Sequence, residues 1–78
     1  MKLAQELCSA LEEWGVGPVD LDTSLIRSGM VDSTALFNLA CWIEERSGRA
    51  IDPSTVDLAH EWDSVRSIVR FVSDARAR

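Results

Sequence analysis

Apolar residues recur at helical spacing in three segments of this chain. The three sets, spaced three and four residues apart, are Leu3, Leu7, Leu11 and Trp14; Leu36, Leu39, Ala40 and Ile43; and Val65, Ile68, Val69 and Val72. Such intervals place side chains on one face of an α-helix. No segment alternates apolar and polar residues as a half-buried strand would. The sequence therefore predicts an all-α fold with amphipathic helices packed around one core.

A long connection separates the first two helical segments. The first helix, over residues 2–14, is expected to end where glycine and proline follow it. Residues 18–31 then combine turn-forming side chains with the apolar residues Leu21, Leu25, Ile26, Met30 and Val31. We expect these apolar residues to hold the connection on the core as an ordered loop. A loop this long inside a small domain is usually functional.

Polar residues mark where the remaining helices begin. Asp32 can cap a second helix that runs to about Ser47, before a terminating glycine. A short third helix is expected over residues 54–59, behind an Asp-Pro pair. Asp63 can cap the last helix. The expected architecture is a four-helix bundle with a long ordered loop between the first two helices and a short third helix.

The size and charge of the chain limit how many domains it can form and which partners it can bind. A chain of 78 residues has room for one core, so residues 1–78 are expected to form a single domain. Thirteen acidic and eight basic residues give a net charge of −5, which repels nucleic acids and anionic lipid surfaces. The first residues carry glutamates where a signal peptide would be apolar, and no apolar run approaches the roughly 20 residues that span a bilayer. We expect a cytoplasmic protein that binds neither nucleic acid nor membrane.

Few residues are arranged for metal binding or catalysis. The one histidine, His60, and two distant cysteines, Cys8 and Cys41, form no ligand cluster, so no metal is expected. Ser33, His60 and an aspartate could in principle form a hydrolytic triad, but no nucleophile-elbow motif surrounds any serine. The chain is not expected to be an enzyme.

Ser33 stands at a position that suits an anionic attachment. It follows Asp32 at the end of the long loop, where the second helix is expected to begin. A phosphodiester on its hydroxyl would lie at the positive end of the helix dipole, near free backbone N–H groups. An isolated Asp-Ser pair more often only starts a helix, so the dipeptide alone does not decide between these interpretations.

The surrounding pattern resembles the acyl carrier and peptidyl carrier protein family over essentially the whole chain. The loop ends in L-I-x-S-G-x-V-D-S, the second helix closes in W-I-E-E-R-S-G, and I-D-P and W-D-S-V follow. The resemblance implies that a phosphopantetheinyl transferase attaches 4'-phosphopantetheine from coenzyme A to Ser33, and that the thiol of this arm carries a thioester. Asp32 matches the acidic residue implicated in transferase recognition. Thr34 and Ala35 depart from the Leu and the acidic residue that many members have after the serine.

The second helix of such carriers is a docking surface. The matching positions are Thr34, Phe37, Asn38, Cys41, Trp42, Glu44 and Glu45. Apolar anchors usually contribute more interface energy than charges, so Phe37 or Trp42 is expected to matter most. The alternative is that Phe37, Cys41 and Trp42 only widen the buried face of the helix.

The resemblance implies a free-standing, monomeric carrier that delivers an acyl or aminoacyl group in polyketide or nonribosomal peptide metabolism. Its expected partners are the phosphopantetheinyl transferase, a loading adenylation enzyme, ligase or acyltransferase, and a downstream transferase or synthase. The alternative function is an unmodified helical protein–protein interaction domain in which Ser33 stays free.

Overall fold

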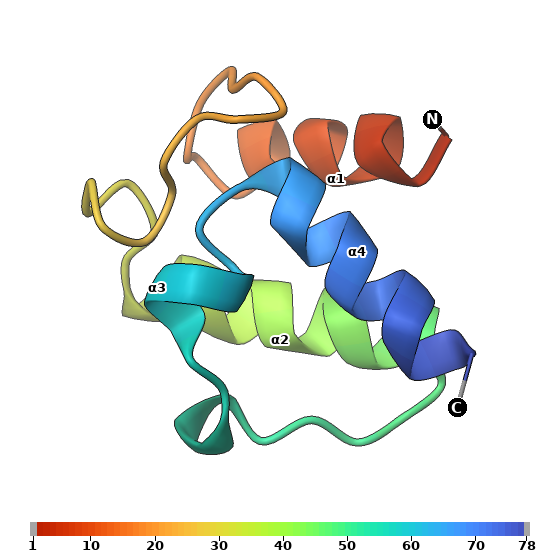
Figure 1. Ribbon diagram of the computed structural model, residues 1–78. Coiled ribbons are helices and arrows are strands. Elements are labelled where there is room, and N and C mark those ends of the chain that lie inside the picture. Colours follow the sequence, from red (N-terminus) through yellow and green to blue (C-terminus); the bar gives the residue numbers. More distant parts are fainter. Residues whose placement is uncertain (1, 78) are drawn as a thin grey trace.

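The structure is a computed structural model that describes residues 2–77. Its elements are α1 (Lys2–Glu13), α2 (Ser33–Ser47), the 3₁₀ turn η1 (Pro53–Thr55), α3 (Leu58–Glu61) and α4 (Val65–Arg76) (Figure 1). The described residues contain no strand. The predictions of an all-α fold, a long first loop and a short third helix are therefore confirmed.

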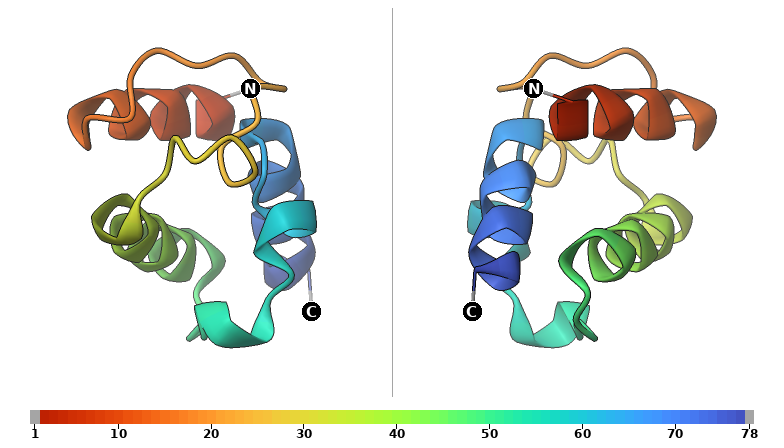
Figure 2. Two further views of the ribbon diagram at one scale, coloured as in Figure 1. Left: turned by 90° about the vertical axis from the view of Figure 1, so that its left-hand side faces the viewer. Right: turned by 90° about the vertical axis from the view of Figure 1, so that its right-hand side faces the viewer.

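Helix α4 is the element against which the other three helices pack. Helix α1 lies across the end where α4 begins (Figures 1 and 2). Helix α2 also packs against α4. The fully buried side chains include Leu7, Leu11, Leu25, Leu39, Ile43, Trp62, Val65, Ile68 and Val72. Most of them belong to the three periodic sets of the sequence. Leu25 and Trp62 come instead from the connections, so the loops contribute to the same core as the helices.

Local signals account for both ends of α2. The Oδ1 atom of Asp32 accepts a hydrogen bond from the backbone N–H of Ala35 at 2.8 Å, which satisfies one of the free donors of the first turn. At the other end Gly48 adopts a left-handed conformation, with φ of 74°, and its N–H donates to the Glu44 carbonyl. A side chain would strain this conformation. The predicted bounds of the second helix are confirmed.

The third helical segment is divided, in contrast to the single helix expected over residues 54–59. Asp52 caps η1 by accepting from the N–H of Ser54 at 3.0 Å. Val56 then has extended backbone angles, and a new turn starts after Asp57. The Asp57 side chain makes no capping hydrogen bond, and the extended backbone at Val56 separates two segments of three and four residues.

The cap of α4 is Ser64, and the prediction of Asp63 is wrong. The Ser64 hydroxyl accepts from the N–H of Ser67 at 3.1 Å, and the Ser67 hydroxyl accepts from the N–H of Ser64 at 3.1 Å. This reciprocal capping box satisfies the first turn without an acidic residue. The Asp63 side chain is therefore available to point away from α4, toward the long loop.

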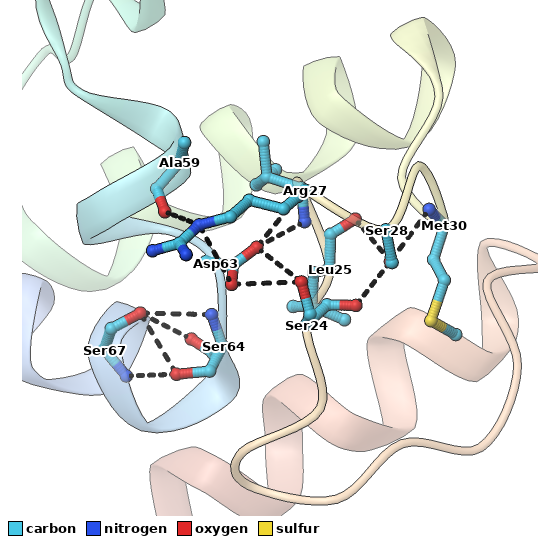
Figure 3. A network of polar contacts seen from close by, with 10 residues as sticks. Ser24, Leu25, Arg27, Ser28, Met30, Ala59, Asp63, Ser64 and Ser67 are labelled. Atoms are coloured by element: carbon cyan, nitrogen blue, oxygen red, sulfur yellow. Dashed lines mark hydrogen bonds and ion pairs between the residues drawn. The ribbon is translucent and has the colours of Figure 1, made fainter.

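Asp63 binds four consecutive residues of that loop (Figure 3). Its Oδ1 atom accepts from the N–H groups of Ile26 at 3.0 Å and Arg27 at 2.9 Å. The Ser24 hydroxyl donates to the carboxylate and lies 3.0 Å from each oxygen. The Asp63 carbonyl accepts from the N–H of Leu25 at 2.6 Å, while the Leu25 side chain is fully buried. The long loop is thus ordered, as the sequence predicted.

These donors hold the pKa of the Asp63 carboxyl below its ordinary value. The largest cause is the backbone N–H of Arg27, followed by the Ser24 hydroxyl, the Ile26 N–H and the charge of Arg27, while partial burial acts in the opposite direction. A carboxyl with a lowered folded pKa stabilises the fold above its unfolded pKa, near 4. This stabilisation is lost as the pH falls through the lower folded pKa.

Replacing Asp63 with Asn should lower the free energy of unfolding by about 2 kcal/mol near neutral pH, because hydrogen bonds to a charged acceptor are lost. The difference from wild type should shrink as the pH falls through the lowered pKa of Asp63, because the carboxyl then becomes protonated and loses its charge. Urea unfolding across this pH range measures both quantities. The Asp22→Asn control removes an exposed ion pair with Arg66 and should have little effect. A deficit that stays constant with pH would contradict the assignment.

Candidate functional site

Ser33 is the first residue of α2 and lies exposed where the long loop ends. Its hydroxyl forms no hydrogen bond with any other described residue. The N–H groups that open a helix have no acceptor within that helix, and they form the positive end of its dipole. An anion attached to this hydroxyl would therefore meet unpaired N–H donors.

Hydrogen bonds within the loop support the residues just before Ser33. The Ser28 hydroxyl donates to the Ser24 carbonyl at 2.5 Å and accepts from the N–H of Met30 at 3.3 Å. The N–H of Val31 donates to the Leu25 carbonyl at 3.2 Å. Figure 3 shows how the contacts of Ser28 adjoin the Asp63 network. The approach to α2 is thus a closed turn.

Asp32 lies exposed beside Ser33 and uses one carboxylate oxygen to cap α2. Its Oδ2 atom makes no hydrogen bond or ion pair with another described residue. Within residues 2–77 no three His, Cys, Asp or Glu side chains gather in a group that could hold a metal ion. Asp32 can therefore cap the helix and still offer one oxygen to a partner.

The described serines differ in whether their hydroxyls are available. Those of Ser24, Ser28, Ser54, Ser64 and Ser67 form hydrogen bonds, and Ser47 is buried. Ser9 and Ser73 are also exposed, but they lie inside α1 and α4, where the helix uses its own N–H groups. Among the described serines, only Ser33 combines an exposed, unbonded hydroxyl with a helix start.

The structure separates the expected docking positions of α2. Phe37 is 69% exposed, and Thr34 and Glu45 are exposed as well. Asn38, Cys41 and Glu44 are half-buried. The Glu44 carboxylate accepts from the N–H of Ile51 at 2.7 Å, so it holds the segment that follows α2. The exposed surface of α2 is therefore smaller and less acidic than the seven docking positions expected from the sequence.

Trp42 is not an exposed anchor, contrary to one of the two expectations for it. Only 7% of its surface is accessible, and it belongs to the core. Residues 35, 39 and 42 follow helical spacing on the inner face of α2, which explains its burial. The Arg46 guanidinium lies 5.1 Å from the centre of its ring and also pairs with Glu6 of α1 at 3.7 Å. For Trp42 the alternative of a widened core face is correct.

Met30 is a surface residue that the sequence interpretation assigned to the core side of the loop. It is 37% exposed, and with Phe37 it makes up the exposed large hydrophobic residues of the part described. Met30 lies three residues before Ser33, and Phe37 lies four residues after it. Gly29, immediately before Met30, has a left-handed conformation with φ of 79°, and apolar periodicity does not reveal such a local turn.

A family comparison matches this arrangement. The model of a family described as phosphopantetheine attachment site matches residues 2–72 of the chain. The chain belongs to this family. Comparisons with curated proteins and with solved structures found no match.

Members of the family are carriers of a 4'-phosphopantetheine group and not enzymes, so this chain is a carrier protein. Carriers of this kind are modified by a phosphopantetheinyl transferase and interact with synthases or ligases. The residues around Ser33 fit the group, because a phosphodiester needs an accessible hydroxyl and gains from nearby N–H donors. No helix in the described part of the carrier is long and apolar enough to cross a membrane.

Stability measurements should separate the two aromatic residues of α2. Trp42→Ala should lower the free energy of unfolding by about 3–5 kcal/mol, because it leaves a cavity in the core. Phe37→Ala should change it by less than about 0.5 kcal/mol, because the ring is mostly in solvent. Denaturant unfolding of both variants provides the measurement, and similar losses in the two would contradict this division of α2.

Proposed function

We propose that Ser33 carries the phosphopantetheine arm and that the carrier delivers an acyl or aminoacyl thioester to biosynthetic enzymes. The observation that carries the proposal is the exposed, unbonded Ser33 hydroxyl at the start of α2. When bound, the arm supplies the thiol that forms the thioester. The protein contributes attachment, presentation and recognition.

The attachment reaction needs little from the carrier itself. A phosphopantetheinyl transferase would join the Ser33 oxygen to phosphorus, break the diphosphate bond of coenzyme A, take up the hydroxyl proton and release the nucleotide. Ser33 provides the oxygen, and the start of α2 provides N–H donors for the resulting phosphodiester. The free Oδ2 atom of Asp32 is available to the transferase. These roles are consistent with the position of both side chains at the surface.

We further propose a role in polyketide or nonribosomal peptide metabolism, in the cytoplasm and as a monomer. An adenylation enzyme, ligase or acyltransferase would load the arm, and a transferase or synthase would accept the cargo. Support comes from the surface near Ser33, where the first half of α2 has Thr34 and Phe37 and only the second half has glutamates. Such a surface favours partners that use apolar contacts more than opposite charge.

Tethering is the physical basis of this function. A flexible arm keeps the cargo near each partner's active site and raises its effective concentration there. A shuttle must also leave each partner, which requires a small interface and fast dissociation. Met30 and Phe37 flank Ser33 in the sequence and expose apolar surface suited to such a brief contact.

Intact-mass measurement tests the attachment. After incubation with coenzyme A and a promiscuous phosphopantetheinyl transferase, the wild-type chain should gain the mass of one arm. Ser33→Ala should abolish the gain because the accepting hydroxyl is gone. Ser9→Ala and Ser73→Ala should each retain it, since both remove an exposed hydroxyl away from a helix start. Wild-type chain that gains no mass would favour the unmodified interaction domain.

A second variant tests the docking role of Phe37. Phe37→Ala should raise the transferase KM about tenfold, as expected when an apolar anchor worth about 1.4 kcal/mol is removed. Glu45→Gln is the matched control on the same helix, and its smaller effect should disappear at high salt. Steady-state kinetics of arm transfer measures both. A Phe37→Ala variant with wild-type KM would show that the ring does not contact this partner.

A further inference from the structure

We propose that Asp63 is a positioning residue for arm attachment, because it holds the long loop in the shape that presents Ser33. The inference rests on the proposed attachment at Ser33. It extends the site to the turn between α3 and α4, far from the serine in the sequence. Asp63 acts through the loop and needs no contact with the transferase or the arm.

One residue binds the loop at four successive positions. Asp63 accepts hydrogen bonds from three backbone N–H groups and one hydroxyl of residues 24–27. The residues that its side chain binds lie 36 to 39 positions earlier in the sequence. Its side chain is only 19% exposed, so solvent cannot easily replace these bonds. Because the N–H groups of residues 25–27 all point at Asp63, their backbone cannot rotate without breaking several bonds together.

The residues bound by Asp63 in turn hold the segment that leads to Ser33. The Leu25 carbonyl accepts from the N–H of Val31, and the Ile26 carbonyl accepts from the N–H of Gly29 at 3.1 Å. The Ser28 hydroxyl closes the same turn onto the Ser24 carbonyl. A continuous set of hydrogen bonds therefore leads from Asp63 to Val31, one residue before the cap of α2.

Arg27 connects this arrangement to α3. Its Nε atom donates to the Ala59 carbonyl at 3.0 Å and lies 3.8 Å from the second carboxylate oxygen of Asp63. In Figure 3 the guanidinium lies beside the carboxylate, between the loop and α3. Asp63 and Arg27 thus join the loop, α3 and the segment just before α4 at one point.

A second link between the loop and α4 provides a matched comparison. The Asp22 carboxylate pairs with the Arg66 guanidinium at 2.8 Å, but both side chains are largely exposed. This pair lies upstream of Leu25, outside the turn that leads to Ser33. Replacing Asp22 should therefore remove an acidic side chain of the loop and its ion pair with Arg66, as the Asp63 variants do for Asp63, but should leave that turn intact.

Loss of Asp63 should reduce the fraction of molecules in which the loop has the shape that the transferase binds. The apparent affinity falls in proportion to that fraction, while a molecule that is bound reacts as before. The expected signature is a higher KM with an unchanged kcat. A loss of global stability alone would not produce it under conditions where the variant is fully folded.

The experiment compares arm transfer to full-length Asp63→Ala, Asp63→Asn and Asp22→Ala, at a temperature where circular dichroism shows each to be folded. Asp63→Ala should raise the transferase KM at least about threefold with kcat unchanged. Asp63→Asn keeps one acceptor oxygen and should show a smaller rise, and Asp22→Ala should match wild type. If Asp63→Ala does not fold, Asp63→Asn and Ser24→Ala carry the comparison. Amide hydrogen exchange in the Asp63 variants should accelerate more at Val31 than at the core amides of α4, whose exchange reports only the loss of global stability.

Folded Asp63 variants with wild-type KM would overturn the inference, and so would a fall in kcat at constant KM or an equal rise in KM for Asp22→Ala. Unchanged exchange at Val31 would also overturn it, because the turn would then not depend on Asp63. These results leave arm attachment to wild-type chain intact. Wild-type chain that accepts no arm at Ser33 would instead overturn the proposed function.

Discussion

The hydrogen bonds between Asp63 and the long loop are the interactions on which the site depends. A loop that crosses a small core must find partners for its backbone N–H groups, because burying them unpaired costs free energy. Leu25 brings the loop to the core by its buried side chain, and Asp63 supplies acceptors for the backbone around it. The segment before Ser33 can therefore be irregular in shape and still ordered.

Helix α2 divides its surface between folding and recognition. Trp42 packs inward and is covered by Arg46, whereas Phe37 projects into solvent within about one turn of Ser33. The two aromatic rings are five residues apart in the sequence, yet one stabilises the core and the other is free to contact a partner.

The start of α2 combines two requirements of a carrier. The capping carboxylate of Asp32 makes the helix begin at a defined residue, so the adjacent Ser33 hydroxyl has a fixed position. The same helix start provides unpaired N–H groups for an attached phosphodiester. Other exposed serines, Ser9 and Ser73, lack this setting because their helices already use the nearby donors. The proposed attachment at Ser33 thus draws on the local geometry of one helix end.

The sequence by itself determined the three long helices, the bounds of α2 and the position of Ser33, because apolar spacing, Asp32 and Gly48 act over a few residues. Family membership agrees with the resemblance carried by the motif around Ser33. Only the tertiary structure decided that Asp63 binds the loop while Ser64 caps α4, that Trp42 is buried, and that Met30 is exposed. Each of these depends on which distant segment lies opposite a side chain, and local periodicity contains no information about that.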